Sequence, residues 1–231
     1  MISNDNASVP VGKESDISDF GPWSNPIELS SLATRYGSDK ASKCGVYERY
    51  FNPIRHKELN FLEIGIGGYD DPKAGGGSLR MWKHYFPKAQ IFGIDYYDKS
   101  VHEEARVKIF RGSQDDSGFL NIVAKAIGRI DVILDDGSHI SAHIIKSFET
   151  LFPLLGDGGL YIVEDIGTSY WPDYGGSPDF LNPDTSMFYF KRLADGLNHF
   201  AFKHEFVPTY YDQHTEFIHF YKNFLILKKT P

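Results

Sequence analysis

Several features are scarce in this chain, and each scarcity excludes a class of protein. The 231 residues include a single cysteine, Cys44, so no disulfide can form within the chain. No apolar run approaches the roughly 18 residues that a membrane span requires, and residues 1–16 lack the basic and then apolar pattern of a secretory signal. We therefore expect a cytoplasmic protein with no membrane partner.

Positive charge is also in short supply. Lys and Arg total 24 against 31 Asp and Glu, which gives a formal net charge of −7. Binding of DNA or RNA depends largely on a positive surface that neutralises phosphates. We therefore expect no nucleic-acid partner.

Length and composition are those of one globular domain. Apolar residues make up 41% and charged residues 24%, which excludes a wholly disordered or fibrous chain. Residues 1–26 differ, because they are rich in Ser, Asn, Asp, Gly and Pro and carry no periodic pattern. We expect a mobile N-terminal tail at 1–26 and one domain at 27–231.

From Ile27 onward, short apolar runs alternate with amphipathic stretches. This alternation predicts a doubly wound α/β fold, in which helices cover both faces of a parallel sheet. The predicted strands are 60–65, 90–95, 107–110, 130–134 and 160–163, and the predicted helices between them are 78–86, 119–127 and 140–155.

The C-terminal segment breaks this rhythm. Apolar runs at 216–221 and 223–227 are separated by a very short connection around Lys222, as in an antiparallel hairpin. A mostly parallel seven-stranded sheet with an antiparallel C-terminal strand is the Rossmann-like arrangement of class I methyltransferases. We predict this fold class.

The first predicted strand ends in a glycine-rich turn that contains Glu63, Gly65 and Gly67. Ligands of doubly wound sheets bind beyond the carboxyl ends of the strands, and small residues there let a ligand approach the backbone. Nicotinamide and flavin cofactors use such turns equally often. Here, however, residues 69–77 separate the glycines from the next helix, for which Ser78 is the expected N-cap, whereas a pyrophosphate needs that helix end close by. The loop therefore favours a cofactor without phosphates.

Two further acids are candidates for cofactor binding. Asp95 ends the second predicted strand, where its carboxylate could accept both hydroxyls of a ribose; the alternative is an ordinary turn residue. Asp115 lies in a polar cluster at 111–116, where class I methyltransferases often place an acid or amide against adenine. An ordinary turn is an equally good interpretation of that cluster.

Two neighbouring strands each end in a pair of acids, Asp135-Asp136 and Glu164-Asp165. Four carboxylates at one edge of a cleft cannot all stay ionised unless a cation holds them or some of their pKa values rise. Magnesium prefers such oxygen ligands, and Asp136, Glu164 and Asp165 are our candidate ligands. Asp135 is expected to face the amino group of the cofactor. The alternative is that some of these acids cap helices or pair with lysines.

His139 follows the first acid pair at the start of a predicted helix. A neutral imidazole beside the metal can accept the proton of a hydroxyl group as that oxygen attacks a methyl group, which makes His139 the candidate general base. Alternatively, His139 and His143 lie one helical turn apart and could both bind a transition metal. A capping or core histidine is the third possibility.

These residues give the chain a specific resemblance. It resembles the S-adenosylmethionine-dependent, magnesium-dependent sugar O-methyltransferases of macrolide biosynthesis, and it is also similar to rhamnosyl and methylmannose O-methyltransferases. The motifs that carry the resemblance are 36–40, 62–72, 75–80, 135–139, 164–165 and 220–224.

The resemblance implies a site that agrees with the one inferred from the residues. It implies that His139 is the base, that Mg²⁺ is bound by Asp136, Glu164 and Asp165, and that S-adenosylmethionine is framed by Glu63, Gly65, Asp95 and Asp115. In the macrolide family that the chain resembles, a large additional N-terminal domain contributes to oligomer formation. We expect no such domain in this chain. The resemblance therefore implies neither the acceptor nor the quaternary structure.

The acceptor side is expected in the aromatic loop 166–180, because long loops often act as lids and aromatic rings suit the apolar faces of sugars. A dimer interface formed by Tyr170 and Trp171 is nearly as good an interpretation, and the predicted helix 188–197 could also contact a second subunit. We therefore expect a homodimer or higher homo-oligomer.

The leading function is methyl transfer to a hydroxyl group of a sugar. The alternatives are a catechol-type O-methyltransferase that acts on a small phenol, a nicotinamide oxidoreductase, which the loop at 69–77 disfavours, and a non-catalytic regulatory protein that binds the cofactor.

Overall fold

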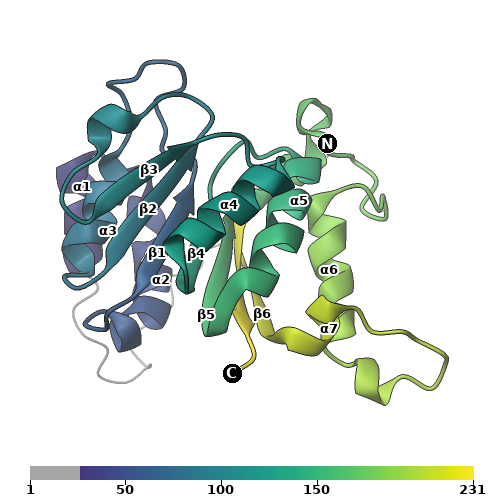
Figure 1. Cartoon of the computed structure of the whole chain (residues 1–231). Coiled ribbons are helices and arrows are strands. Elements are labelled where there is room, and N and C mark those ends of the chain that lie inside the picture. Colours follow the sequence, from purple (N-terminus) through teal and green to yellow (C-terminus); the bar gives the residue numbers. More distant parts are fainter. Residues whose placement is uncertain (1–26) are drawn as a thin grey trace, which may run out of the picture.

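The computed structural model describes residues 27–231, so the tail expected at 1–26 lies outside the described residues. Seven strands form one sheet in the order β3-β2-β1-β4-β5-β7-β6 (Figure 1). The parallel strands are β1 (Asn60–Ile64), β2 (Gln90–Asp95), β3 (Val107–Arg111), β4 (Ile130–Asp135) and β5 (Leu155–Glu164). Strand β7 (Phe224–Lys229) is antiparallel to both β5 and β6 (Thr215–Tyr221), which confirms the predicted fold class.

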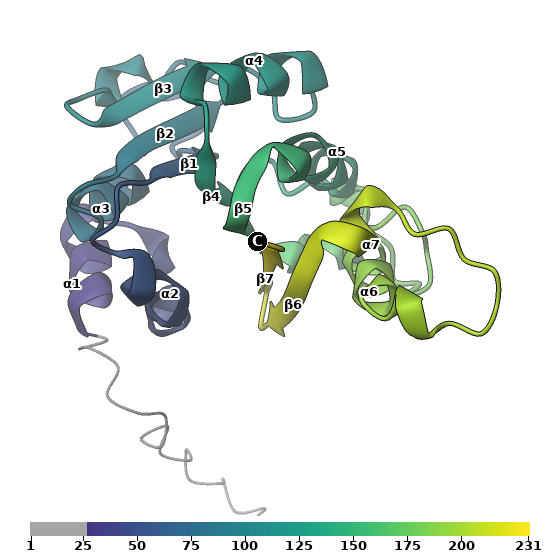
Figure 2. The ribbon, with the colours of Figure 1, turned by 60° about the horizontal axis from the view of Figure 1, so that its bottom comes forward.

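Helices cover both faces of the sheet (Figure 2). One face packs against α1 (Ile27–Tyr36), α2 (Cys44–Phe51) and α3 (Gly77–Tyr85). The other packs against α4 (Ser117–Ile127), α5 (Ser141–Leu151) and α6 (Ser186–Gly196), and the short α7 (Tyr210–His214) precedes β6. Side chains alternate between the faces of a strand, so strands buried on both faces are apolar almost throughout.

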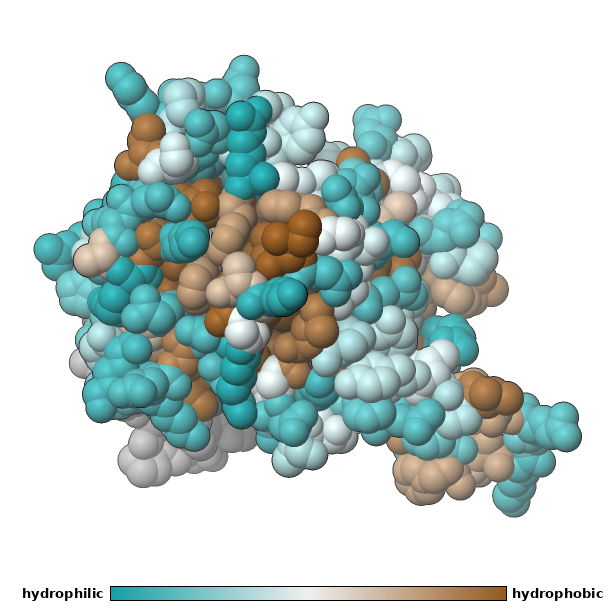
Figure 3. All heavy atoms as spheres, viewed as in Figure 1, coloured by the Kyte–Doolittle hydropathy of each residue, from teal (hydrophilic) through white to brown (hydrophobic). Residues whose placement is uncertain are grey.

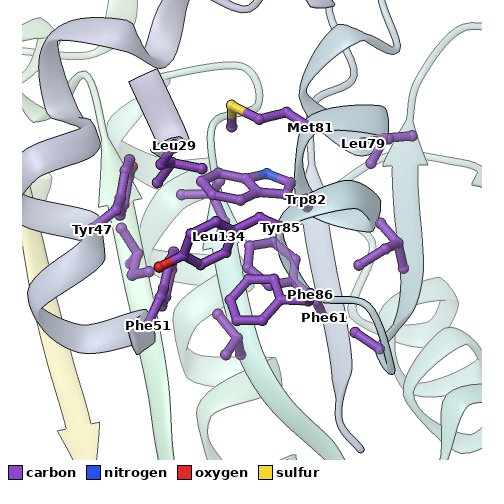
Figure 4. Close-up of a cluster of buried hydrophobic side chains, with 14 of the residues drawn as sticks. Leu29, Tyr47, Phe51, Phe61, Leu79, Met81, Trp82, Tyr85, Phe86 and Leu134 are labelled. Atoms are coloured by element: carbon purple, nitrogen blue, oxygen red, sulfur yellow. The ribbon is translucent and has the colours of Figure 1, made fainter. Parts of the chain in front are cut away.

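The core beneath α1–α3 is built on aromatic rings (Figure 4). Trp82 stacks on Phe61 of β1 with ring centroids 5.1 Å apart, and its edge-on contact with Phe51 of α2 spans 5.6 Å. Burial of such large rings contributes most of the apolar area in a core. This cluster fixes α2, and the turn that precedes it, against the sheet.

The structure corrects several predicted boundaries, among them the start of β5, which was expected at 160. The helix expected at 140–155 ends at Leu151, because Pro153 lies in a 3₁₀ turn, and β5 already begins at Leu155. Ser78 is not the N-cap of α3; Gly76 holds that position with a left-handed backbone, and the Ser78 hydroxyl group donates instead to Glu63 Oε2 at 2.9 Å.

The segment between α6 and α7 projects from the domain, and its surface mixes apolar and polar side chains (Figure 1 and Figure 3). Phe200 and Val207 of this segment are 80% and 88% exposed. Across residues 27–231, none of the helices combines the length and apolarity needed to cross a bilayer. The expected homo-oligomer stays a prediction.

Candidate active site

The carboxyl ends of the parallel strands open into a cavity of about 750 Å³. Both halves of the site predicted from the sequence contribute to this cavity. The predicted residues that line it are Gly65, Asp95, Asp136, His139 and Asp165. The strand order explains their convergence. Strand β1 lies between β2 and β4, and β5, which is directly followed by Asp165, lies next to β4.

The glycine turn after β1 is packed too closely for a side chain. Gly65 has a φ of +87°, and a Cβ atom there would lie 2.2 Å from the carbonyl oxygen of Asp136. The turn of the cofactor half therefore rests directly on the turn of the acidic half. A glycine is required here by both the backbone conformation and the space.

The loop between this turn and α3 is held by a buried lysine, Lys99, that no sequence pattern indicated. Lys99 Nζ donates to the backbone carbonyls of Asp71 at 2.6 Å and Ala74 at 3.1 Å, and the lysine is fully buried. His102 Nε2 lies 3.2 Å from the same Ala74 carbonyl. The loop that frames the glycine turn is therefore pinned from the connection after β2.

Asp95 lies at the end of β2, as predicted, and lines the cavity. Its Oδ2 accepts the backbone N–H of Ile66 at 2.9 Å, and its Oδ1 accepts that of Tyr97 at 2.8 Å. Each carboxylate oxygen can accept a second hydrogen bond. Asp95 therefore ties the glycine turn to β2 and retains capacity for two ligand hydroxyls.

Glu63 lies beneath the cavity, fully buried. Burial raises the pKa of this carboxyl to about 8, although Lys40 lowers it. Glu63 Oε1 has no hydrogen-bond partner among residues 27–231, and Lys40 Nζ is 3.6 Å from it. Glu63 therefore supports the turn from below and does not line the cavity itself.

Besides Glu63, two further predicted cofactor contacts fall outside the cavity lining formed by the described residues. Asp115 is exposed, and its Oδ1 accepts a hydrogen bond from the Ser113 hydroxyl group. Its Oδ2 lies 3.5 Å from His143 Nε2. Asp135 is buried and accepts from Gln114 Nε2 at 3.0 Å and from the Ser147 hydroxyl group. The structure thus places Gln114 at the cavity and Asp135 behind it.

Of the three predicted magnesium ligands, Asp136 and Asp165 line the cavity, whereas Glu164 is fully buried and is not among the lining residues. Two lysines lie among these acids. Lys40 Nζ is 2.6 Å from Asp136 Oδ2 and 3.3 Å from Glu164 Oε1. Lys43 Nζ contacts Glu164 Oε2 and lies 3.6 Å from Asp165 Oδ1. The acids therefore have cationic partners within the chain, which was the alternative considered for this cluster.

The electrostatic environments of these acids differ. Burial raises the pKa of Asp136 to about 7, against the lowering effect of Lys40. Burial also acts to raise the pKa of Glu164, but Lys40 and Lys43 outweigh it and lower that pKa. The Tyr47 hydroxyl group donates to Glu164 Oε1, so Glu164 is a charged carboxylate held by three side chains of the segment 40–47.

His139 faces the acids across the cavity. Its Nε2 lies 3.9 Å from Asp165 Oδ2, and ligand atoms of Asp136, His139 and Asp165 all lie within 4.8 Å of one another. Within the described part of the chain, this group has the geometry to hold a metal ion. Two carboxylates with room for further oxygens suit Mg²⁺.

Backbone geometry and a hairpin residue set the directions of these ligands. His139 and Asp165 have left-handed backbones with φ of 59° and 52°, a conformation that such residues adopt at a cost of about 1–3 kcal/mol and that clusters at functional sites. Asn223, at the β6–β7 turn, donates Nδ2 to Asp165 Oδ1 at 2.6 Å. The hairpin therefore positions Asp165, a link that no local pattern indicated.

The two-histidine alternative is not supported by this arrangement. His143 Nδ1 lies 3.0 Å from the Ser138 hydroxyl oxygen, and its Nε2 is directed to Asp115. His143 is therefore absent from the group formed by Asp136, His139 and Asp165.

The aromatic loop after β5 reaches the same cavity. It starts with a 3₁₀ helix, η5 (Ile166–Tyr170), and Tyr174 lines the cavity. Trp171 packs edge-on against Tyr174 with ring centroids 5.8 Å apart, and much of Trp171 is exposed. The loop therefore brings the Tyr174 ring to the cavity that His139 and Asp165 also line.

The seven-stranded sheet and the cavity beyond its parallel strands define a class I methyltransferase fold. The chain's close homologues within this class are O-methyltransferases that act on sugars of natural products. No protein-family model matches the chain.

Two curated relatives and one crystal structure show the extent of this similarity. The chain is 47% identical to the 8-demethyl-8-alpha-L-rhamnosyl tetracenomycin-C 2′-O-methyltransferase of Streptomyces olivaceus, over 87% of this chain and 54% of that protein. It is 40% identical to the mycinamicin VI 2″-O-methyltransferase of Micromonospora griseorubida, over 90% of this chain and 54% of that protein. The MycE methyltransferase in complex with Mg, SAH and mycinamycin VI matches with a TM-score of 0.84 and 41% identity, over 88% of this chain and 53% of that one. The chain thus spans about half the length of each relative.

Proposed function

We propose that this chain transfers a methyl group from S-adenosylmethionine to a hydroxyl group of a sugar in a glycoside, with Mg²⁺ as a cofactor and His139 as the general base. The observation that carries the proposal is the single cavity, which brings the glycine turn and Asp95 together with Asp136, His139 and Asp165. A methyltransferase needs both halves in one cavity, because the acceptor oxygen must approach the methyl carbon in line with the bond from that carbon to sulfur.

The donor half fits a nucleoside that lacks a pyrophosphate. Gly65 and Gly67 leave the backbone open to a ligand, and Asp95 can accept two ribose hydroxyls. Gln114 lines the cavity in place of the expected Asp115 and offers an amide near the position where adenine would lie. The MycE structure, which contains SAH, supports the same choice of cofactor.

The acceptor half fits a divalent cation. Asp136 and Asp165 would hold Mg²⁺, with Glu164 available if Lys43 yields its contact. The bound cation would supply a positive charge that favours loss of the acceptor proton and orients the hydroxyl group.

His139 then has a defined role in the transfer. As the acceptor oxygen bonds to the methyl carbon, the bond from that carbon to sulfur breaks and its electron pair stays on sulfur, which leaves S-adenosylhomocysteine. The imidazole of His139 takes the hydroxyl proton, and Asp165 Oδ2, 3.9 Å from Nε2, stabilises the resulting positive charge. The left-handed backbone holds the ring toward the cavity.

The acceptor class follows from the aromatic loop and from the relatives. Tyr174 and Trp171 offer flat apolar faces of the kind that pack against sugar rings. The relatives are named for methylation of a rhamnosyl group and of mycinamicin VI, which supports a natural-product glycoside.

Methyl transfer from labelled S-adenosylmethionine to a panel of glycosides tests the proposal. We expect product with a rhamnoside or macrolide glycoside, loss of turnover in excess EDTA, and recovery with added Mg²⁺. Methylation of catechol alone would favour the phenol-specific alternative. Tight cofactor binding without transfer to any acceptor would favour the regulatory one, and full activity of metal-stripped protein in EDTA would exclude the metal.

A further inference from the structure

Two lysines bridge the three acids that we propose as magnesium ligands. Lys40 Nζ lies between Asp136 and Glu164, at 2.6 Å and 3.3 Å, and Lys43 Nζ lies between Glu164 and Asp165. Each ammonium group thus joins a neighbouring pair of ligands, as a shared metal ion would. Both lysines belong to one short turn, η1 (Asp39–Lys43), which leads into α2.

Lys40 is positioned by its acidic partners. It is 1% exposed, and burial of an ammonium group costs several kcal/mol unless carboxylates compensate it. Its next acidic neighbour, Glu63 Oε1, lies 3.6 Å away and has no hydrogen-bond partner among the described residues. The ammonium group therefore has a second buried acceptor within a short movement of Asp136.

The two ammonium groups offset most of the negative charge of the proposed ligands. The three proposed ligands Asp136, Glu164 and Asp165 carry a formal charge of −3 when ionised, and the two ammonium groups reduce it to −1. Without the lysines the same three carboxylates would carry −3, which is costly to assemble at a largely buried site before any metal arrives.

We propose that Lys40 and Lys43 are positioning residues that hold the acids in place in the absence of metal and compete with Mg²⁺ for them. On metal binding, Lys40 exchanges its contact with Asp136 for one with Glu63. This inference rests on the proposed magnesium site. It makes the lysines determinants of metal affinity, although neither is a ligand.

Substitution of Lys40 separates this role from a purely structural one. Lys40→Met removes a positive charge next to the metal position, so we expect Mg²⁺ to bind at least roughly tenfold more tightly than to the wild type. The metal-free variant should melt at a lower temperature, and Mg²⁺ should raise its melting temperature by more than it does for the wild type. Lys40→Arg keeps the charge and should restore an affinity near that of the wild type.

Isothermal titration calorimetry with Mg²⁺ alone, together with thermal melts, gives both readouts without turnover. Lys83→Met is the matched control, because Lys83 pairs with Glu104 at 3.1 Å on the surface and should leave Mg²⁺ affinity unchanged. If Lys40→Met fails to fold by circular dichroism, Lys43→Met, whose lysine is 15% exposed, should show the same tightening.

The outcomes distinguish this inference from the proposed function. If the wild type binds Mg²⁺ and Lys40→Met binds it equally or more weakly, the lysines do not compete with the metal and only the inference is overturned. If neither protein binds Mg²⁺, the magnesium site is overturned together with the inference. Tight binding by Lys40→Met, stronger than that of the wild type, supports both.

Discussion

Replacement of Asp95 by alanine tests the cofactor half of the site most directly. The carboxylate accepts the backbone N–H groups of Ile66 and Tyr97, and its remaining acceptor capacity faces the cavity. Asp95→Ala therefore removes the two charge-assisted hydrogen bonds that we propose to the ribose, and it loosens the glycine turn. With partial compensation by water, we expect a loss of about 2–4 kcal/mol in binding, which is roughly a 30- to 1000-fold rise in the Kd of S-adenosylmethionine.

The fold should survive this change. The two orphaned N–H groups lie at the edge of a cavity that water can enter, so the cost in free energy of unfolding should be about 1–2 kcal/mol. Titration calorimetry with S-adenosylmethionine and with S-adenosylhomocysteine measures the binding, and urea denaturation of the ligand-free protein measures the stability.

Asp98→Ala is the matched control. Asp98 lies three residues further on, accepts the backbone N–H of Ser100 at 3.0 Å, and is exposed. Its replacement should leave cofactor affinity unchanged. If Asp95→Ala binds S-adenosylmethionine within roughly threefold of the wild type, a difference below about 1 kcal/mol, then Asp95 does not hold the ribose and our placement of the cofactor is incorrect.

Three further predictions concern other parts of the molecule. His139→Ala should lower the rate constant of methyl transfer by roughly 10²–10⁴ in single-turnover experiments while cofactor affinity holds; a loss of Mg²⁺ binding instead would identify a metal ligand. Lys99→Met removes the clasp on the carbonyls of Asp71 and Ala74, so the KM for S-adenosylmethionine should rise by roughly tenfold at constant kcat; a fall in kcat alone would refute this role. Burial raises the pKa of Glu48 to about 7 from 4.5, so the folded state binds this proton more tightly and wild-type stability should fall as pH rises between these values. Urea denaturation should therefore show that the free energy of unfolding of Glu48→Gln, relative to that of the wild type, rises by up to about 3 kcal/mol from pH 4.5 to pH 8. A difference that does not change with pH would contradict the raised pKa of Glu48.

Periodicity predicted most of the secondary structure, because it reports which face of an element is buried. Strand β2 begins and ends where predicted, at Gln90 and Asp95, since its apolar run is bounded by polar residues. The end of α5 was misplaced because the apolar pattern continues through Phe152 and Leu155, where the chain has already left the helix. Apolar residues show that both α5 and β5 are buried, but they do not show where the helix ends and the strand begins.

The acids of the site could be predicted because a parallel sheet brings the carboxyl ends of its strands to one edge. Asp95 ends its strand, and Asp136 and Asp165 directly follow theirs, so the topology alone implies that they meet. The direction of each side chain could not be obtained in the same way. Asp135 and Asp136 are adjacent in sequence, yet the first lies behind the cavity and the second lines it.

The amino-acid sequence by itself thus determined the fold class, the glycine-rich turn after the first strand, and the acids at the carboxyl edge of the sheet. Each of these depends on local pattern and on general rules of sheet geometry. Only the tertiary structure decided which cations accompany the acids. Lys40 and Lys43 lie more than 90 residues before their partners Asp136 and Glu164, and Asn223 lies far beyond Asp165 in the chain. Such contacts arise when α2 and the C-terminal hairpin pack against the sheet, and no local periodicity encodes a pairing across that distance.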